Sequence, residues 1–365
     1  MINRLVIENL KYRWVRTLGS AMIVGILVAS IITLIGLSRG MLEESAERAK
    51  GVGADIVLRH DTGAATSLQT GPINEKFLAV VRKQPHVVQA MGVLGQTVET
   101  ITVMNGVNIA EFEKMSGGFH YVEGGPPIEP DDLLVDEPYA RQKHLHPGDT
   151  VNLLNHNWHL SGVIEGGMLA RFVVRLDTLQ NLTENTGRLN QIYVKLDDPA
   201  RTDAEVDIFN KLFAGDLKAM SLPDFLAIFS INNIGPLKVF ISVIEVMWVS
   251  VGFLVVFLSM YTAVVERTRE IGILKALGAK PLMILDLLVR EAVLLALVGW
   301  VLGIGLALVA RVGILRIAPA SLNVINVPDF WPTAALIALI GALLGAIYPG
   351  MKAARHDAIE ALSYE

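Results

Sequence analysis

The sequence predicts a membrane protein with four transmembrane helices and a large extracytoplasmic α+β domain that carries a β-rich insert. Three observations support this fold class. The 365 residues are 52% apolar with a mean hydropathy of +0.47, which is more apolar than an average soluble domain. Four apolar runs are each long enough to cross a bilayer. Between the first two runs lie about 185 residues in which alternating segments are mixed with helical spacing.

The chain opens with a basic segment followed by the first apolar run. Residues 1–16 contain four basic side chains against one acid, and their apolar positions predict a short amphipathic helix on the cytoplasmic membrane surface. Residues 17–38 carry no charge, which is enough to span about 30 Å of hydrocarbon. A cleaved signal peptide is the alternative, but its apolar core is only about 7–15 residues long. We therefore expect a transmembrane helix and a charged helical stalk over residues 17–50.

Residues 51–236 are expected to form the extracytoplasmic domain. The expected strands are 54–59, 96–103, 133–136 and 191–196, and the expected helices are 74–83 and 202–213. A β-rich insert is expected at about residues 111–170, where Gly-Gly and Pro-Pro pairs separate short strand-like segments. This order is typical of a split α+β domain.

Three further spans follow this domain. They are expected at 237–265, 292–310 and 331–350, with a loop at 266–291, an outer loop at 311–330 and a tail at 351–365. An even number of spans places both termini on the same side of the membrane.

The distribution of charge indicates which side that is. The N-terminal segment, the 266–291 loop and the tail are rich in Lys and Arg, whereas the 311–330 loop has only Arg311 and Arg316. Residues 40–236 carry 26 acidic and 16 basic side chains, and the rest of the chain carries 10 and 15. The positive-inside rule therefore predicts that both termini and the 266–291 loop are cytoplasmic and that the large domain lies outside.

The most distinctive stretch is ERTREIGILKALGAKP at residues 266–281. Good helix formers followed by Gly and Pro predict a short helix with a defined end. Ile271, Leu274 and Leu277 recur every three residues and form one apolar stripe. Such a helix either docks a protein on one side of the membrane or lies on the lipid headgroups, and the residue pattern alone leaves both readings open.

This stretch resembles the signature loop of FtsX-like ABC permeases, the type VII superfamily that includes MacB and the lipoprotein-release subunits LolC and LolE. Residues 348–362 resemble the closing motif of that family, apart from Ala358, where the family often carries Pro. The insert resembles the β-rich subdomain of MacB-type outer domains. The resemblance implies a multi-pass protein of the bacterial inner membrane whose 266–291 loop is a coupling helix seated on an ATPase.

The resemblance also assigns residues to this coupling role. They are Glu266, Arg267, Arg269, Glu270, Ile271, Gly272, Leu274, Lys275, Leu277 and Gly278. It implies that Glu266, Arg267 and Glu270 anchor the loop, and that Ile271, Leu274 and Leu277 insert toward the ATPase. The alternative for the basic members is contact with lipid headgroups.

ATP binding is expected on another chain. No GxxxxGK[ST] phosphate-binding loop is present, so we expect a permease that is not an enzyme and has no cofactor of its own. The expected partners are a separate ABC ATPase subunit, a second permease copy (identical or related), membrane lipids, and a periplasmic adaptor or carrier protein. No nucleic-acid partner is expected.

Catalytic and metal chemistry have little support in the sequence. There are no cysteines, which excludes disulfides and thiolate metal sites. The histidines with short spacing, which are His144, His146, His156 and His159, match no known zinc pattern, so no metal site is expected. No nucleophile–base order or carboxylate pair stands out, and no catalytic residue is assigned.

Two features of the spans remain as candidates. Glu245 is the one acid inside an expected span. It either has a function there, or it reaches the outer interface or pairs across the helix bundle. Gly299 with Gly303, and Gly341 with Gly345, form GxxxG pairs. Such pairs mediate either static close packing or a sliding contact between helices.

The leading functional hypothesis is a dimeric permease subunit that transmits ATPase motion across the membrane to its outer domain. This mechanotransmission would export or extract a lipid, lipoprotein, peptide or hydrophobic drug, and the sequence does not reveal which. The alternative is an FtsX-type regulator that activates an extracytoplasmic cell-wall hydrolase. A membrane-anchored enzyme is a third possibility, with no residue constellation behind it.

Overall fold

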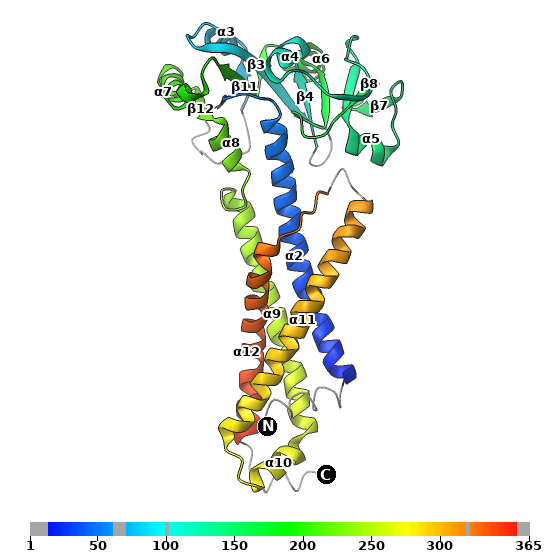
Figure 1. The fold of residues 1–365 in the computed structure, drawn as a ribbon, viewed down its shortest axis with the longest axis vertical. Helices are drawn as coiled ribbons and strands as arrows, with labels where there is room; N and C mark the ends of the chain where they lie inside the picture. The colour runs from blue at the N-terminus through cyan, green and yellow to red at the C-terminus, as the bar shows by residue number, and fades with distance from the viewer. Residues whose placement is uncertain (1–13, 61–70, 99–101, 318–321, 356–365) are drawn as a thin grey trace. The chain divides into compact units, whose positions relative to one another are not determined.

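The computed structural model describes residues 14–60, 71–98, 102–317 and 322–355 (Figure 1). The chain divides into two compact units. The first, called the helical unit, comprises residues 1–38, 239–316 and 324–365. The second, called the sheet domain, comprises residues 39–238 and 317–323. Most of the expected N-terminal amphipathic helix and the last ten residues of the tail lie outside the described residues.

Among the described residues, four helices are long and apolar enough to cross a membrane. They are α2 (Trp14–Lys50), α9 (Gly235–Glu266), α11 (Pro281–Ile317) and α12 (Trp331–Arg355). A short helix, α10 (Thr268–Ala276), lies between α9 and α11, and a 3-10 turn, η2 (Pro328–Phe330), precedes α12. The expectation of four membrane helices is therefore confirmed.

Two of these helices are longer than the spans expected from hydropathy. α11 begins at Pro281, so residues 281–291, expected as part of a loop, form its first turns. Asp286 and Arg290 lie one turn apart there and form an ion pair of 2.9 Å, which supports a helix that hydropathy does not detect. α12 likewise continues beyond the expected span to Arg355.

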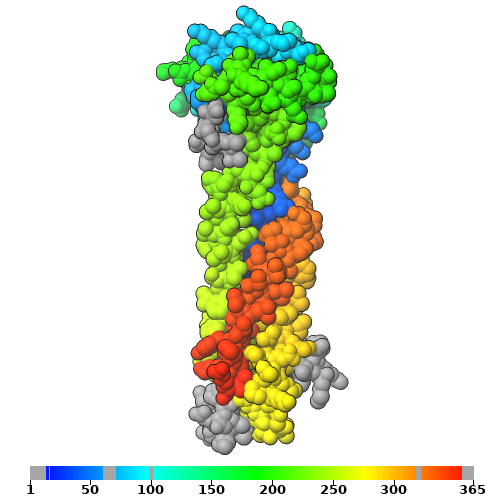
Figure 2. Space-filling model, turned by 90° about the vertical axis from the view of Figure 1, so that its left-hand side faces the viewer, coloured from blue at the N-terminus to red at the C-terminus, as the bar shows by residue number. Residues whose placement is uncertain are grey.

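Glycines set the closest contacts inside the helical unit. A Cβ on Gly303 of α11 would lie 2.6 Å from the Cβ of Val28 in α2. A Cβ on Gly345 of α12 would lie 2.8 Å from a backbone oxygen of α9. Figure 2 shows α12 running between α9 and α11 on the face that it presents. At both positions a side chain larger than that of glycine would clash with the neighbouring helix, as expected of GxxxG packing between membrane helices.

Within the described residues, the sheet domain is built on a ten-stranded mixed sheet with the order β12-β1-β11-β3-β4-β9-β6-β8-β5, and β7 pairs with β8. The strands are β1 (Ile56–His60), β3 (Val87–Thr97), β4 (Val103–Val107), β5 (Tyr121–Gly124), β6 (Asp132–Asp136), β7 (Thr150–Leu153), β8 (His156–Ile164), β9 (Phe172–Arg175), β11 (Gln191–Leu196) and β12 (Leu217–Ser221). A small second sheet pairs β2 (Ile73–Asn74) with β10 (Arg188–Leu189). β4 and β9 are parallel, as are β6 and β8, and the other neighbours are antiparallel.

Helices cover both faces of this sheet. They are α3 (Lys76–Val81), α4 (Ile109–Ser116), α5 (Glu137–Lys143), α6 (Leu176–Leu182), α7 (Thr202–Leu212) and α8 (Leu222–Ile228), with a 3-10 turn, η1 (Pro199–Arg201), before α7. Ile56 of β1 packs in a core with α3 and α7, whereas its neighbour Val57 packs in a second core with α4, α8 and the end of α2. This alternation is what a strand buried on both faces requires.

The domain departs from expectation at one strand. The residues expected as a single strand at 96–103 are the end of β3 and the start of β4, which pair antiparallel with Thr97 opposite Val103. The reason is that the sequence there alternates and is rich in β-branched residues without a Gly or Pro to mark a turn. The prediction of one strand was therefore wrong.

The β-rich insert belongs to the same sheet as the rest of the domain. Its strand β6 pairs antiparallel with β9, which in turn lies parallel to β4. The insert therefore joins the sheet through β9, the strand that follows it, and β9 in turn pairs with β4, the strand that precedes it.

Candidate functional site

The helix expected from the signature stretch is α10, and a break at Arg267 separates it from α9. Arg267 has φ −112° and ψ 16°, outside helical geometry, and its carbonyl oxygen accepts a hydrogen bond of 2.9 Å from the Ile271 N–H. The Thr268 hydroxyl donates to the carbonyl oxygens of Val264 and Val265, the last turn of α9. Gly278 has φ +91° just after α10, a conformation that favours glycine, so the chain can turn there into α11.

A buried ion pair connects the start of α10 with α11. Arg267 Nη1 lies 3.3 Å from Glu291 Oε2, and the two side chains are only 8% and 2% exposed. Removing either partner would leave a buried charge uncompensated. Sequence reasoning singled out Arg267 as an anchor of the loop but not its partner. The sequence feature that could have identified Glu291 as this partner is its position directly before the third apolar run.

The apolar side chains of α10 do not all face outward. Ile271 is buried and packs with Val264, Ile284 and Leu288 of the same chain. The expectation that Ile271 inserts toward a partner was therefore wrong. Leu277 is 81% exposed. Residues three apart in an α-helix are offset by about 60° around the helix axis. Over the two steps from Ile271 to Leu277 this offset adds up, so the two side chains face different surroundings.

The exposed surface of this region, called the α10 surface, combines apolar and charged side chains. Ile273 and Leu277 are exposed, as is Leu282 in the first turn of α11. Glu266, Arg269, Glu270 and Gly278 are also exposed, whereas Leu274 and Lys275 are half-buried and Gly272 is buried. Exposed leucines with charges around them suit a protein contact better than open water. Ile273 and Leu282 were missed because they fall outside the expected stripe.

A second cluster of charges attaches the end of α2 to the sheet domain. Arg48 Nη2 lies 3.0 Å from Asp136 Oδ2 and also contacts Glu44 one turn earlier in α2. Arg171 lies against both acids, 3.1 Å from Glu44 Oε1 and 3.5 Å from Asp136 Oδ2. Burial raises the pKa of the Asp136 carboxyl, and the two guanidinium groups oppose that effect. These four residues, called the stalk cluster, join α2 to the ends of β6 and β9.

Backbone contacts reinforce the same attachment. The Leu169 N–H donates a hydrogen bond of 3.0 Å to the Arg48 carbonyl oxygen. A Cβ on Gly51 would lie 2.4 Å from the Gly167 carbonyl oxygen, so only glycine allows this approach. The end of α2 is thus fixed to the domain by side chains and by main chain. The Glu44 and Arg48 spacing was visible in the sequence, but its partners 88 and more residues away were not.

Glu245 lies in α9 and is half-buried. No hydrogen bond or ion pair joins its carboxylate to any of the described residues. A function for Glu245 within the span therefore stays a prediction from the sequence.

Three of the four histidines considered for metal binding lie beside single acids. His146 pairs with Glu123, and His156 and His159 pair with Asp131 and Asp132. Among the residues that the structure describes, no group of three or more metal-ligating side chains comes together. Each pair is a short surface contact between neighbouring strands and loops.

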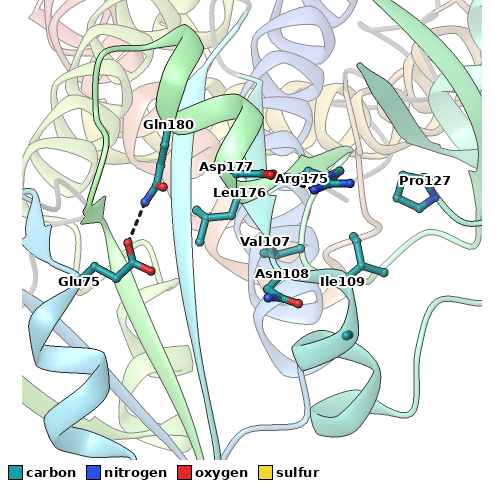
Figure 3. A pocket seen from close by; sticks show the side chains of 10 residues that line it. Glu75, Val107, Asn108, Ile109, Pro127, Arg175, Leu176, Asp177 and Gln180 are labelled. Atoms are coloured by element: carbon teal, nitrogen blue, oxygen red, sulfur yellow. Dashed lines mark hydrogen bonds and ion pairs between the residues drawn. The ribbon is translucent and has the colours of Figure 1, made fainter. Parts of the chain in front are cut away.

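A cavity of about 410 Å³ in the sheet domain holds charges that are already paired (Figure 3). Arg175 donates to Asp177, and this hydrogen bond lowers the pKa of the Asp177 carboxyl. The Gln180 amide donates to Glu75 on the far side of the same cavity. Because its charges are satisfied within the domain, this cavity gives no indication of a ligand.

Comparison with known proteins identifies the family. Residues 17–211, more than half of the chain, match the MacB-like periplasmic core domain, and residues 242–358 match the FtsX-like permease C-terminal family. The chain belongs to the MacB-like ABC transporter permeases. The sheet domain of this permease is accordingly extracytoplasmic.

Individual relatives of this MacB-like permease are distant. An uncharacterized ABC transporter permease of Mycobacterium tuberculosis is 23% identical over 354 residues, which cover 95% of each chain. The macrolide export ATP-binding/permease protein MacB of Nitrobacter winogradskyi is 27% identical over 390 residues, which cover 94% of this chain and 57% of that protein. The crystallised periplasmic region of MacB from Actinobacillus actinomycetemcomitans is 16% identical, with a TM-score of 0.39 over 48% of this chain and 92% of that one.

Proposed function

We propose that this permease transmits the movement of a separate ATPase subunit to its extracytoplasmic domain, and so exports or extracts a lipid, lipoprotein, peptide or hydrophobic drug. One observation supports this most directly. α2 is a single helix from its apolar span to Lys50, and the stalk cluster fixes its last turns to the domain. A helix that is continuous and attached at its end is suited to carry a displacement.

The α10 surface is the proposed point at which the ATPase acts. Its exposed leucines supply an apolar contact, and the buried pair of Arg267 with Glu291 ties α10 to α11. In this proposal α10, both termini and the tail are cytoplasmic, the chain works as a dimer in a bacterial inner membrane, and ATP is bound by the partner subunit. Arg269 and Glu270 then form the charged part of the contact. The exposed leucines, rather than the buried Ile271, form its apolar part.

The proposal is tested by reconstituting the permease with its ATPase in lipid nanodiscs. Because the chain has no cysteine, Thr150→Cys in the domain and Val309→Cys in α11 give two specific spin-label positions. ATP is expected to change the distance between the labels in the parent chain but not after Leu277→Asp. The same substitution at the exposed Leu212 of the domain is the matched control and should preserve the change. An unaltered ATP response in the Leu277→Asp chain would contradict the proposal.

A regulator of an outer hydrolase would use the same movement. The match to the MacB-like core domain over residues 17–211 supports the exporter assignment. Affinity purification of the permease from its own membrane decides between them. Recovery of a periplasmic adaptor or carrier supports export, and recovery of a cell-wall hydrolase overturns it.

A further inference from the structure

The sheet domain contains a second and larger cavity, of about 590 Å³, beside the end of α2. α2 supplies Ser45 and Ala49 to its wall, and α8 supplies Phe225 with Phe229 just after it. The remaining lining residues come from β3, β4 and β11, and from Leu169 and Asn190, which precede β9 and β11. A volume in this range is typical of a small-molecule site.

The cavity wall is uncharged. Its described lining residues include no Lys, Arg, Asp, Glu or His, although residues 40–236 carry 42 charged side chains. Tyr193 also lines the cavity, and burial raises the pKa of its phenol, so the group stays neutral at physiological pH. A charged ligand would lose hydration here without gaining an opposite charge, which makes its binding costly.

Polar groups on the sheet wall keep unused hydrogen-bonding capacity. The Asn190 Oδ1 accepts a bond of 2.7 Å from the Gly95 N–H, and the Gln191 Oε1 accepts one of 2.9 Å from the Tyr193 hydroxyl. Their amide NH₂ groups donate to none of the described residues. The Asn105 NH₂ donates to the Leu169 carbonyl oxygen, which leaves the Asn105 Oδ1 free to accept. The wall therefore offers two donors and one acceptor close together.

The opposite wall is apolar. Phe225 and Phe229 form an edge-to-face pair at 5.4 Å, and Ala49 and Leu169 extend this apolar surface toward α2. A ligand that fills the cavity must therefore present an apolar part to one side and neutral hydrogen-bonding groups to the other.

We propose that this cavity binds a neutral amphipathic molecule whose polar end carries amide or hydroxyl groups. The site goes beyond the proposed function, because binding requires only the domain and α2. If that function holds, α2 carries this site with the domain when the ATPase acts, because the stalk cluster fixes the last turns of α2 to the sheet.

The test uses the full permease in nanodiscs, without any ATPase. Thr97→Cys places a single thiol at the exposed end of β3 inside the cavity, and Thr150→Cys places one on β7 outside it. The probe is decanoyl-N-methylglucamide, a neutral amphiphile with an amide and several hydroxyls, used below its micellar concentration. It is expected to slow maleimide modification of the Thr97→Cys thiol at least fivefold and saturably, without slowing that of the Thr150→Cys thiol.

Charged amphiphiles of similar chain length provide the discriminating comparison. Decyl sulfate and decyltrimethylammonium are expected to protect the Thr97→Cys thiol at least tenfold more weakly. Equal protection by all three probes, protection of both thiols alike, or no protection at all would overturn the proposal. Since binding is measured without nucleotide, these outcomes do not depend on whether the permease transmits ATPase motion.

A second variant tests the wall itself. Gln191→Glu keeps the oxygen that accepts from Tyr193 but replaces the free NH₂ donor with a charge. It should weaken protection by the neutral probe at least tenfold in the Thr97→Cys background. Gln84→Glu adds the same charge away from the cavity and should leave protection unchanged. Unchanged protection in the Gln191→Glu chain would contradict the assignment of the polar end.

Discussion

At the scale of single residues, Arg267 shows how one side chain can both interrupt a helix and hold the pieces together. Its backbone leaves helical geometry between α9 and α10, while its guanidinium group reaches Glu291 in α11. Both groups are almost fully removed from solvent. Two opposite charges in such surroundings are tolerated only together, so the pair sets the position of α10 against α11.

The pair can be tested by comparing single and double substitutions. Arg267→Met leaves the Glu291 carboxylate buried alone, and we expect it to lower the free energy of unfolding by about 3–5 kcal/mol. Arg267→Met with Glu291→Met removes both charges and should recover most of that loss. Denaturant titration of the detergent-solubilised permease measures both. Arg290→Met is the control, because its pair with Asp286 is exposed and contributes less than about 1 kcal/mol. Additive losses in the double variant would contradict the argument.

The sequence predicted these residues unevenly. The signature stretch identified α10, its glycine end and Arg267, because helix propensity and the family resemblance are both local properties of the chain. It did not predict Glu291, Asp136 or Arg171, because a partner that is distant in sequence is chosen by tertiary packing. Ile271 was misplaced for the same reason, since a short stripe does not reveal which neighbour covers it.

At the scale of elements, the membrane helices are held together by small residues more than by polar contacts. α2 and α11 approach closely at Gly303, and α9 and α12 approach at Gly345. In lipid there is no hydrophobic gain from bringing two apolar helices together, so van der Waals contact between close backbones carries much of the association. The GxxxG spacing predicted these faces because it is a property of one helix. It did not predict which helix each face meets.

Two glycines of α11 provide a matched test of this packing. Gly303→Ala would place its methyl group 2.6 Å from Val28, so we expect α2 and α11 to separate slightly and the free energy of unfolding to fall by about 1–3 kcal/mol. Gly305 has no atom of a neighbouring residue within 4 Å of the added methyl group. Gly305→Ala should therefore leave stability unchanged or raise it by up to about 1 kcal/mol, because Ala favours the helix. Equal effects of the two substitutions would contradict close packing at Gly303.

The strands show a similar limit. β11 was predicted with its observed bounds because its alternation ends at a turn signal. The pairing of β3 with β4 was not, because the sequence alternates from one strand into the next without a Gly or Pro. The sheet order, with parallel pairs formed across long connections, follows from packing that no single segment encodes.

At the scale of the whole molecule, the proposed mechanism depends on which side of the membrane each segment occupies. In this proposal each of the four membrane helices crosses once, so α10 lies on the side opposite to the extracytoplasmic domain. α10 must then be cytoplasmic to meet an ATPase. The basic residues near α10 and in the last turn of α12 agree with this arrangement, because they would face the anionic inner leaflet.

This arrangement is tested by labelling single cysteines in spheroplasts, which lack the outer barrier but keep a sealed cytoplasmic membrane. The chain has no cysteine of its own, so any modification reports the introduced residue. We expect a membrane-impermeant maleimide to modify Thr150→Cys in intact cells, and Lys275→Cys only after the membrane is permeabilised. Arg316→Cys, near the outer end of α11, is a second outward position that is independent of the domain and should behave like Thr150→Cys. Modification of Lys275→Cys in sealed cells would place α10 outside the cytoplasmic membrane. A cytoplasmic ATPase could not contact it there, so this result would contradict the proposed mechanism.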